Sequence, residues 1–142
     1  MRDEPRSVQR SFRLSRRTVE LLDAAASESG ESRNALTDRL LGEAVRLVRH
    51  PLIRFHLGPA GRRQPIIVGT RLYVHQIVST LRASRGDVEE AASYLAIAPR
   101  LVRAAVEYYA EFEDEIDEDA AIAARAEESE RSRWERQQRT FA

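Results

Sequence analysis

The chain has 142 residues, 23 basic and 23 acidic side chains that leave no net charge, and no cysteine. That length allows one domain or two very small ones, and the lack of cysteine excludes disulfides and thiolate zinc sites. No apolar run reaches the roughly 18 residues that span a bilayer, so we expect a cytoplasmic protein with no membrane contact.

Residues 8–15 alternate between apolar and polar types and predict a single short strand. Its inward face would carry Val8, Phe12 and Leu14. Its outward face would carry Gln9, Ser11 and Arg13. Two predicted helices follow with no second strand, and an unpaired strand leaves its N–H and C=O groups unsatisfied. We therefore expect the same segment of a second copy to pair with it, which predicts an obligate homodimer with a two-stranded antiparallel ribbon.

The two helices of the first unit, residues 6–49, have clear start and stop signals. Ser15 can cap the first helix and Gly30 can end it. Ser32 can cap the second helix, which Pro51 stops. A single copy of this unit has too few large apolar side chains to bury a sufficient core. Folding and dimerisation are therefore expected to be one event.

A two-stranded ribbon of this kind fits the major groove of DNA. Arginine pairs there with guanine and glutamine with adenine. The predicted base-reading residues are Gln9, Ser11 and Arg13. Free N–H groups at the start of the second helix can bind phosphate, although an ordinary capped helix would have the same sequence. The predicted phosphate contacts are Arg10, Ser32, Arg33 and Asn34.

The second unit, residues 50–117, is predicted to combine a small amount of strand with helices. Prolines and glycines between residues 50 and 61 indicate a loop. Residues 65–74 then predict a β-hairpin that turns at Gly69-Thr70.

Three helices are predicted after the hairpin. The first begins at Val74, the second is opened by Asp87, and the third has Pro99 at its first position. The second and third are separated by a short turn, which is typical of a helix-turn-helix. The apolar face of the third helix is predicted to consist of Leu101, Val102, Ala105, Val106, Tyr109 and Phe112.

Charge is distributed unevenly along the chain. Residues 6–17 hold five arginines and no acid, whereas residues 111–119 hold seven acids and no base. The acidic run fits a solvated hinge, and it lacks the glycine and the alternation of a calcium loop. Residues 118–142 have a helical composition with few apolar groups. We expect this tail to be disordered when free and to fold on a partner.

The sequence shows no constellation typical of an enzyme. No nucleophile with a paired base, glycine-rich phosphate loop or separated pair of carboxylates is visible. The histidines, His50, His56 and His75, lack metal-ligand spacing and are expected to be structural. We therefore predict a non-enzymatic protein without a metal or cofactor. A nuclease that uses the acidic run with these histidines is the alternative from another class.

Residues 8–48 resemble the ribbon-helix-helix family of DNA-binding proteins. The resemblance rests on the strand ending Phe12-Arg13-Leu14-Ser15, the helix after it, Gly30-x-Ser32, and a second helix beginning Arg33-Asn34-Ala35-Leu36. It implies that the alternate outward strand residues read bases and that residues 32–34 clamp phosphate. Arg10 stands where the family usually has an apolar residue.

Residues 50–117 resemble a small family, labelled as a domain of unknown function, that occurs in many antitoxin operons. The matching segments are Pro65-Ile66-Ile67-x-Gly69-Thr70-Arg71-Leu72-x-Val74, Gly86-Asp87-Val88-Glu89-Glu90-Ala91 and Val102-x-Ala104-Ala105-x-x-Tyr108. The whole chain is similar to an antitoxin of the VapB type. This resemblance implies a cognate PIN-like ribonuclease toxin as partner, because such antitoxins precede their toxin-neutralising part with a dimeric DNA-binding unit.

The resemblance also gives the tail a role. PIN-like nucleases cut RNA with acidic side chains that hold Mg²⁺, so a tail that binds there would offer an apolar anchor and a cation in place of the metal. The candidate toxin-binding residues are Arg131, Arg133, Trp134, Arg136, Arg139 and Phe141. The sequence does not distinguish among the arginines, and a merely solubilising tail is the alternative.

Together these features predict a mainly α-helical protein: a ribbon-helix-helix dimer, a small helix-turn-helix-like domain with a β-hairpin, and an arginine-rich tail. The expected function is a type II antitoxin that neutralises a PIN-like ribonuclease, binds its operator double-stranded DNA as a dimer and represses its own operon. The alternative is a stand-alone ribbon-helix-helix repressor with a sensing or second DNA-binding domain. The arginines that favour the alternative are Arg62, Arg63 and Arg71.

Overall fold

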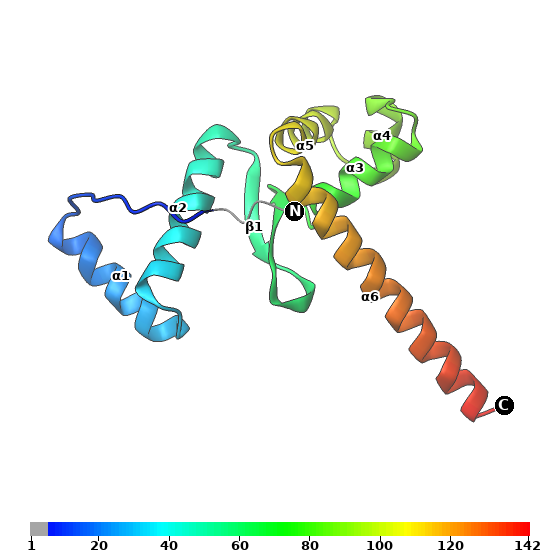
Figure 1. Ribbon diagram of the computed structural model, residues 1–142. Helices are drawn as coiled ribbons and strands as arrows, with labels where there is room; N and C mark the ends of the chain where they lie inside the picture. Colours follow the sequence, from blue (N-terminus) through cyan, green and yellow to red (C-terminus); the bar gives the residue numbers. More distant parts are fainter. Residues whose placement is uncertain (1–5) are drawn as a thin grey trace. The chain divides into compact units, whose positions relative to one another are not determined.

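The computed structural model describes residues 6–142 and is mainly helical, with one small antiparallel sheet (Figure 1). The chain divides into an N-terminal unit that ends at Gly42 and a C-terminal unit that begins at Glu43. Among the described residues, no helix combines the length and the apolar character needed to cross a lipid bilayer. The elements are α1 (Arg16–Ser29), α2 (Arg33–Arg49), β1 (Ile53–Leu57), a 3₁₀ turn (Pro59–Gly61), β2 (Arg63–Ile67), α3 (Val74–Ala83), α4 (Val88–Leu95), α5 (Pro99–Glu111) and α6 (Glu113–Thr140).

Helices α1 and α2 begin and end where the sequence signals predict. The Oγ of Ser15 accepts a hydrogen bond from the N–H of Thr18 at 3.2 Å, and the Oγ of Ser32 accepts one from the N–H of Ala35 at 3.1 Å. Gly30 follows α1 with a φ of +71°, a left-handed conformation that suits glycine best. These caps satisfy backbone groups that the end turns would otherwise leave unpaired.

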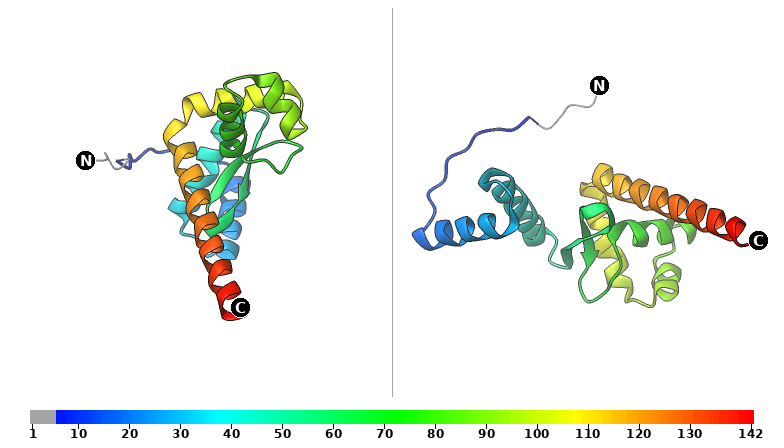
Figure 2. Two further views of the ribbon diagram at one scale, coloured as in Figure 1. Left: turned by 90° about the vertical axis from the view of Figure 1, so that its right-hand side faces the viewer. Right: turned by 90° about the horizontal axis from the view of Figure 1, so that it is seen from below.

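The segment before α1 is extended but unpaired in the single chain (Figures 1 and 2). Residues 6–15 form no hydrogen-bonded strand, and the predicted ribbon would need a second strand that one copy does not supply. The ribbon-helix-helix architecture therefore stays a proposal. Within residues 6–42, only Ala26 and Leu36 are buried. The N-terminal unit has almost no core of its own.

The hairpin of the C-terminal unit differs from the one predicted over residues 65–74. Strand β2 pairs with β1, which lies before it, in an antiparallel register that places Ile53 opposite Ile67. Part of the segment predicted as a loop, residues 50–61, is thus a strand. The expected turn at Gly69-Thr70 is followed by a single bridge rather than by a strand. Prolines and glycines around β1 indicated a loop, whereas the burial of two isoleucines decides the pairing.

The core of the C-terminal unit lies between the hairpin and helices α3, α4 and α5. Three residues, 96–98, join α4 to α5 and form the predicted helix-turn-helix connection. The sequence predicted Tyr109 on the apolar face of α5, but the tyrosine that is fully buried there is Tyr108. The Tyr109 hydroxyl accepts a hydrogen bond from Arg82 and donates one to Asp117 at the rim. The buried apolar side chains are Ile53, Ile67, Val74, Ile77, Val78, Ala91, Ala92, Val102, Ala105, Tyr108 and Ile116.

The last two turns of α2 belong to the C-terminal unit. Leu47 packs against its core, and Arg46 pairs with Glu115 at the start of α6. The contacts therefore divide the chain before these turns, rather than after residue 49 as predicted. Apolar spacing along α2 did not reveal this division, because the spacing is the same on both sides of it.

Residues 113–140 form one continuous helix, α6, which passes through the predicted start of a disordered tail at residue 118. Ile116 and Asp119 are buried in its first turns, and this packing supplies the nucleus that an isolated helix lacks. The following residues are largely alanine, glutamate and arginine, which are good helix formers. Figure 1 and the left view of Figure 2 show the second half of α6 running beyond the other elements of the C-terminal unit.

Candidate functional site

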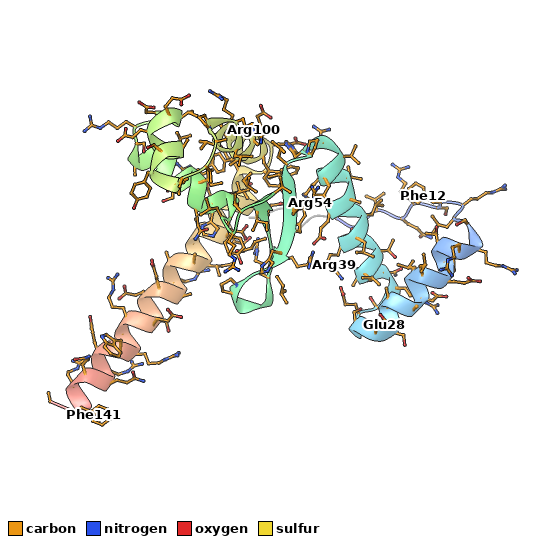
Figure 3. All side chains as sticks on the ribbon, turned by 180° about the vertical axis from the view of Figure 1, so that it is seen from behind. Phe12, Glu28, Arg39, Arg54, Arg100 and Phe141 are labelled. Carbon is orange, nitrogen blue, oxygen red and sulfur yellow. The ribbon has the colours of Figure 1, made fainter. Side chains whose placement is uncertain are left out.

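The segment before α1 exposes side chains of both predicted faces. The exposed base-reading candidates are Gln9, Ser11 and Arg13. The predicted inward side chains are also exposed, Val8 by 70%, Phe12 by 73% and Leu14 by 52% (Figure 3). Burial of one such side chain contributes about 1.5–3 kcal/mol. The N-terminal unit therefore does not cover its own apolar side chains. Because both faces of the segment are exposed in one copy, their burial does not show which face would contact a DNA groove.

The predicted phosphate contacts at the start of α2 are held by local interactions. Ser32 uses its hydroxyl to cap the helix. The Nε of Arg33 lies 2.8 Å from a carboxylate oxygen of Asp23, and both side chains are largely exposed. Arg10 and Asn34 are exposed. An exposed ion pair is worth little in water, so Arg33 can exchange Asp23 for a phosphate at small cost.

The candidate toxin-binding arginines and Trp134 lie in the exposed second half of α6, and Phe141 directly follows the last residue of this helix. Residues spaced by three, four and three positions follow one stripe of a helix, and this spacing aligns Arg131, Trp134, Gln138 and Phe141. Trp134 and Phe141 line the same shallow hollow and are 61% and 90% exposed. We call this row of side chains the aromatic stripe. Of the four candidate arginines, only Arg131 lies on it. The three that the helix turns away from the stripe are Arg133, Arg136 and Arg139.

The acidic run of residues 111–119 is not a solvated hinge, because basic side chains of the same unit pair with it. These contacts fasten the end of α5 and the first turns of α6 to the end of α2, the hairpin and α3. The Arg46 guanidinium also lies over the Phe112 ring, 4.8 Å from its centroid. The pairs are Arg46–Glu115 (2.7 Å), Arg49–Glu111 (2.9 Å), His50–Glu111 (2.8 Å), Arg62–Glu118 (3.2 Å), Arg62–Asp119 (2.8 Å) and Arg82–Asp117 (3.8 Å).

We call these six pairs the clamp. The sequence analysis did not predict the clamp, although the distribution of charge along the chain indicated it. Residues 44–86 hold eight arginines, three histidines and no acid. A folded unit with that excess of cations needs carboxylates from elsewhere in the chain, and residues 111–119 are the densest source. Five of the seven acids in the run that the nuclease alternative uses pair with basic side chains here. Among the described residues, no group of three His, Asp or Glu side chains is arranged to hold a metal ion.

Asp119 is the most enclosed carboxylate of the clamp. It is 2% exposed, and its Oδ1 lies 2.8 Å from the Nε of Arg62. Burial raises the pKa of the Asp119 carboxyl, while the Arg62 guanidinium and a hydrogen bond from Gln64 oppose that rise. Arg62 therefore counteracts the effect of burial on the pKa of Asp119.

Arg62→Ala should destabilise the C-terminal unit by about 2 kcal/mol at pH 7. This loss is smaller than the roughly 3–5 kcal/mol for breaking a fully buried pair, because Arg62 itself is one-third exposed. Without Arg62 the pKa of Asp119 rises further. A carboxyl whose folded pKa exceeds its unfolded pKa costs stability as pH rises through that interval. The difference from wild type should shrink as pH falls from 7 to about 4.

Thermal unfolding followed by circular dichroism at both pH values measures this difference. Arg100→Ala is the matched control, because Arg100 is an exposed arginine on α5 of the same unit (Figure 3). A stability loss that stays constant between the two pH values would show that Arg62 acts by packing rather than through the Asp119 charge.

The helix-turn-helix pair carries the wrong charge for docking on DNA. In that motif the second helix enters the major groove while the first crosses the phosphate backbone. Helix α4 begins with Asp87, Glu89 and Glu90, and Glu89 lies 3.5 Å from Arg103 of α5. Three carboxylates at the start of α4 would repel phosphate. The geometry of the motif is present, but its electrostatics favour a structural role.

The comparisons with known proteins find no family model, no curated protein and no solved structure that matches the chain. The case for a function therefore rests on this chain's own residues and on the motifs that its sequence displays.

Proposed function

We propose that the protein is a type II antitoxin: a cytoplasmic homodimer that binds operator DNA, represses its own operon and neutralises a PIN-like ribonuclease. The observation that carries this proposal is the uncovered apolar surface of the N-terminal unit. Phe12 in the extended segment is 73% exposed, and Leu21 and Leu41 on the helices are 54% and 52% exposed. A unit with so little core needs a second copy to become stable.

An antiparallel pair of these segments would meet that need. Each strand satisfies the backbone groups of the other, and the apolar side chains of both copies become covered. The opposite face then offers one set of polar side chains from each copy to a major groove. Arg10 and Arg33 would lie at the edge of the ribbon and at the start of α2, where phosphates contribute affinity without sequence preference.

The second half of α6 supports a protein partner. Its exposed aromatic stripe is too apolar for a segment that only keeps the protein in solution. Residues 131–142 hold four arginines and one acid, so the segment complements an acidic cleft. The acidic site of a PIN-like nuclease has that chemistry.

Co-expression with the product of the neighbouring gene tests this proposal. The full chain should co-purify with that product and relieve its toxicity, whereas a chain truncated after residue 124 should bind operator DNA but lose both properties. The truncation keeps Ile116 and Asp119, which anchor α6. If the truncated chain still protects the cells, the tail is not the neutralising segment. If the full chain gives neither complex nor protection, the repressor alternative replaces the antitoxin.

A further inference from the structure

One face of the C-terminal unit carries three aromatic rings in a row, and the function proposed above does not use it. The Tyr73 ring stacks on the ring of His75, with centroids 5.6 Å apart and planes 14° apart. It meets the ring of His56 edge-on, with centroids 6.3 Å apart. The Tyr73 hydroxyl also lies 3.3 Å from Nδ1 of His56. His56 is exposed, and the other two rings are half-buried.

Two exposed arginines, Arg54 and Arg71, lie on segments next to this row of rings. Arg54 and His56 alternate on β1 and therefore share a face of the hairpin. Ile66 of β2 lies opposite Arg54 and bridges to Tyr73 on its other side. Two strand spacings, about 10 Å, thus separate the backbones of Arg54 and Tyr73. Arg71 is exposed two residues before Tyr73. We call His56, Tyr73, His75, Arg54 and Arg71 the hairpin platform.

The arginines of the platform keep their charge available for a ligand. Glu118 and Asp119 neutralise the neighbouring Arg62, and Glu43 neutralises Arg63. In contrast, within residues 6–142 no carboxylate pairs with Arg54 or Arg71. The Arg54 guanidinium donates to the carbonyls of Pro51 and Ile53, which fixes its position but leaves its charge.

We propose that the hairpin platform binds single-stranded nucleic acid. Proteins that bind single strands combine aromatic side chains, on which bases stack, with cations that track the phosphates. The platform supplies both in one place. Duplex DNA hides its base faces inside the helix, so stacking on aromatic side chains selects unpaired bases.

Binding is tested with the full chain and a fluorescein-labelled single-stranded decamer, as DNA in one arm and as RNA in the other. A second decamer carries 2-aminopurine, whose fluorescence falls when the base stacks on an aromatic ring. Wild-type protein should raise the anisotropy and quench the 2-aminopurine. Tyr73→Leu should weaken binding about tenfold and abolish the quenching, because it removes the central ring but keeps apolar volume. Arg71→Ala should weaken binding about threefold and lower its salt dependence.

Arg100→Ala is the matched control and should leave both signals at the wild-type level, because it removes an exposed arginine of the same unit outside the platform. His56→Ala provides a second variant on an exposed position, in case the Tyr73 variant folds poorly. Absence of quenching by wild-type protein, or equal affinities for the platform variants and Arg100→Ala, would overturn the proposal. Operator duplex binding by the same variants stays at the wild-type level in either case, so this result is independent of the antitoxin proposal.

Discussion

Phe12→Asp is expected to leave the protein monomeric and to abolish operator binding. In a paired ribbon Phe12 of both copies moves from 73% exposure in the single chain to a covered position between strand and helices. Loss of that burial costs about 2 kcal/mol per copy, and enclosure of a carboxylate adds several more. Because the two strands together fill the groove, a monomer presents half of the base-reading surface and loses at least about 1,000-fold in operator affinity.

Sedimentation velocity across micromolar concentrations gives the oligomeric state, and a gel-shift assay with the DNA upstream of the gene gives the operator affinity. Leu57→Asp is the matched control. Leu57 is an exposed apolar residue of the hairpin, 58% exposed, that lies outside the N-terminal unit. A Phe12→Asp protein that remains dimeric and binds the operator like Leu57→Asp would refute the ribbon.

The helices of this fold were predictable because their boundaries depend on residues close in sequence. Ser15 and Ser32 cap α1 and α2, the Asp87 carboxylate accepts a hydrogen bond from the N–H of Glu90 at 3.0 Å, and Pro99 occupies the first position of α5. Each signal acts within one turn of helix. A single sequence contains all the information that such a boundary needs.

The missed features depend on partners that are distant in sequence. Strand β1 is a strand because β2 buries Ile53 against Ile67, and the flanking prolines gave the opposite indication. Helical periodicity is compatible with either Tyr108 or Tyr109 on the apolar face of α5. Tyr108 is the buried one because of where the core lies, which the periodicity does not show. Single-sequence patterns give little information about such pairings.

The candidate sites follow the same division. Local sequence patterns indicated the segment before α1 and the residues near the end of α6 as candidate sites. The helical geometry of α6 then places one of the four candidate arginines, Arg131, on the stripe of Trp134. The clamp between α6 and the rest of its unit joins residues up to 69 positions apart, as in Arg46 with Glu115. The hairpin platform likewise gathers His56 and Tyr73 across β2. Such clusters become visible only once the chain is folded.

Trp134→Ala is expected to weaken the complex with the toxin about 30-fold or more, because a buried tryptophan at the centre of an interface typically contributes 2 kcal/mol or more. Arg131→Glu should weaken it by a similar factor, since Arg131 shares the stripe of Trp134 and Phe141 and would face the same acidic cleft. Arg136→Glu is the matched control: it makes the same charge reversal on the opposite side of α6.

Isothermal titration of each variant with the purified toxin measures the three affinities. All three side chains are exposed, so circular dichroism should show unchanged helicity. Operator binding should also stay at the wild-type level, because the substitutions lie in the tail. If Arg136→Glu weakens the complex more than Arg131→Glu, the toxin binds the arginine-rich side of α6 and the aromatic stripe is not its anchor. Equal losses for both arginines would mean that the partner attracts the total charge of the tail without recognising one face of the helix.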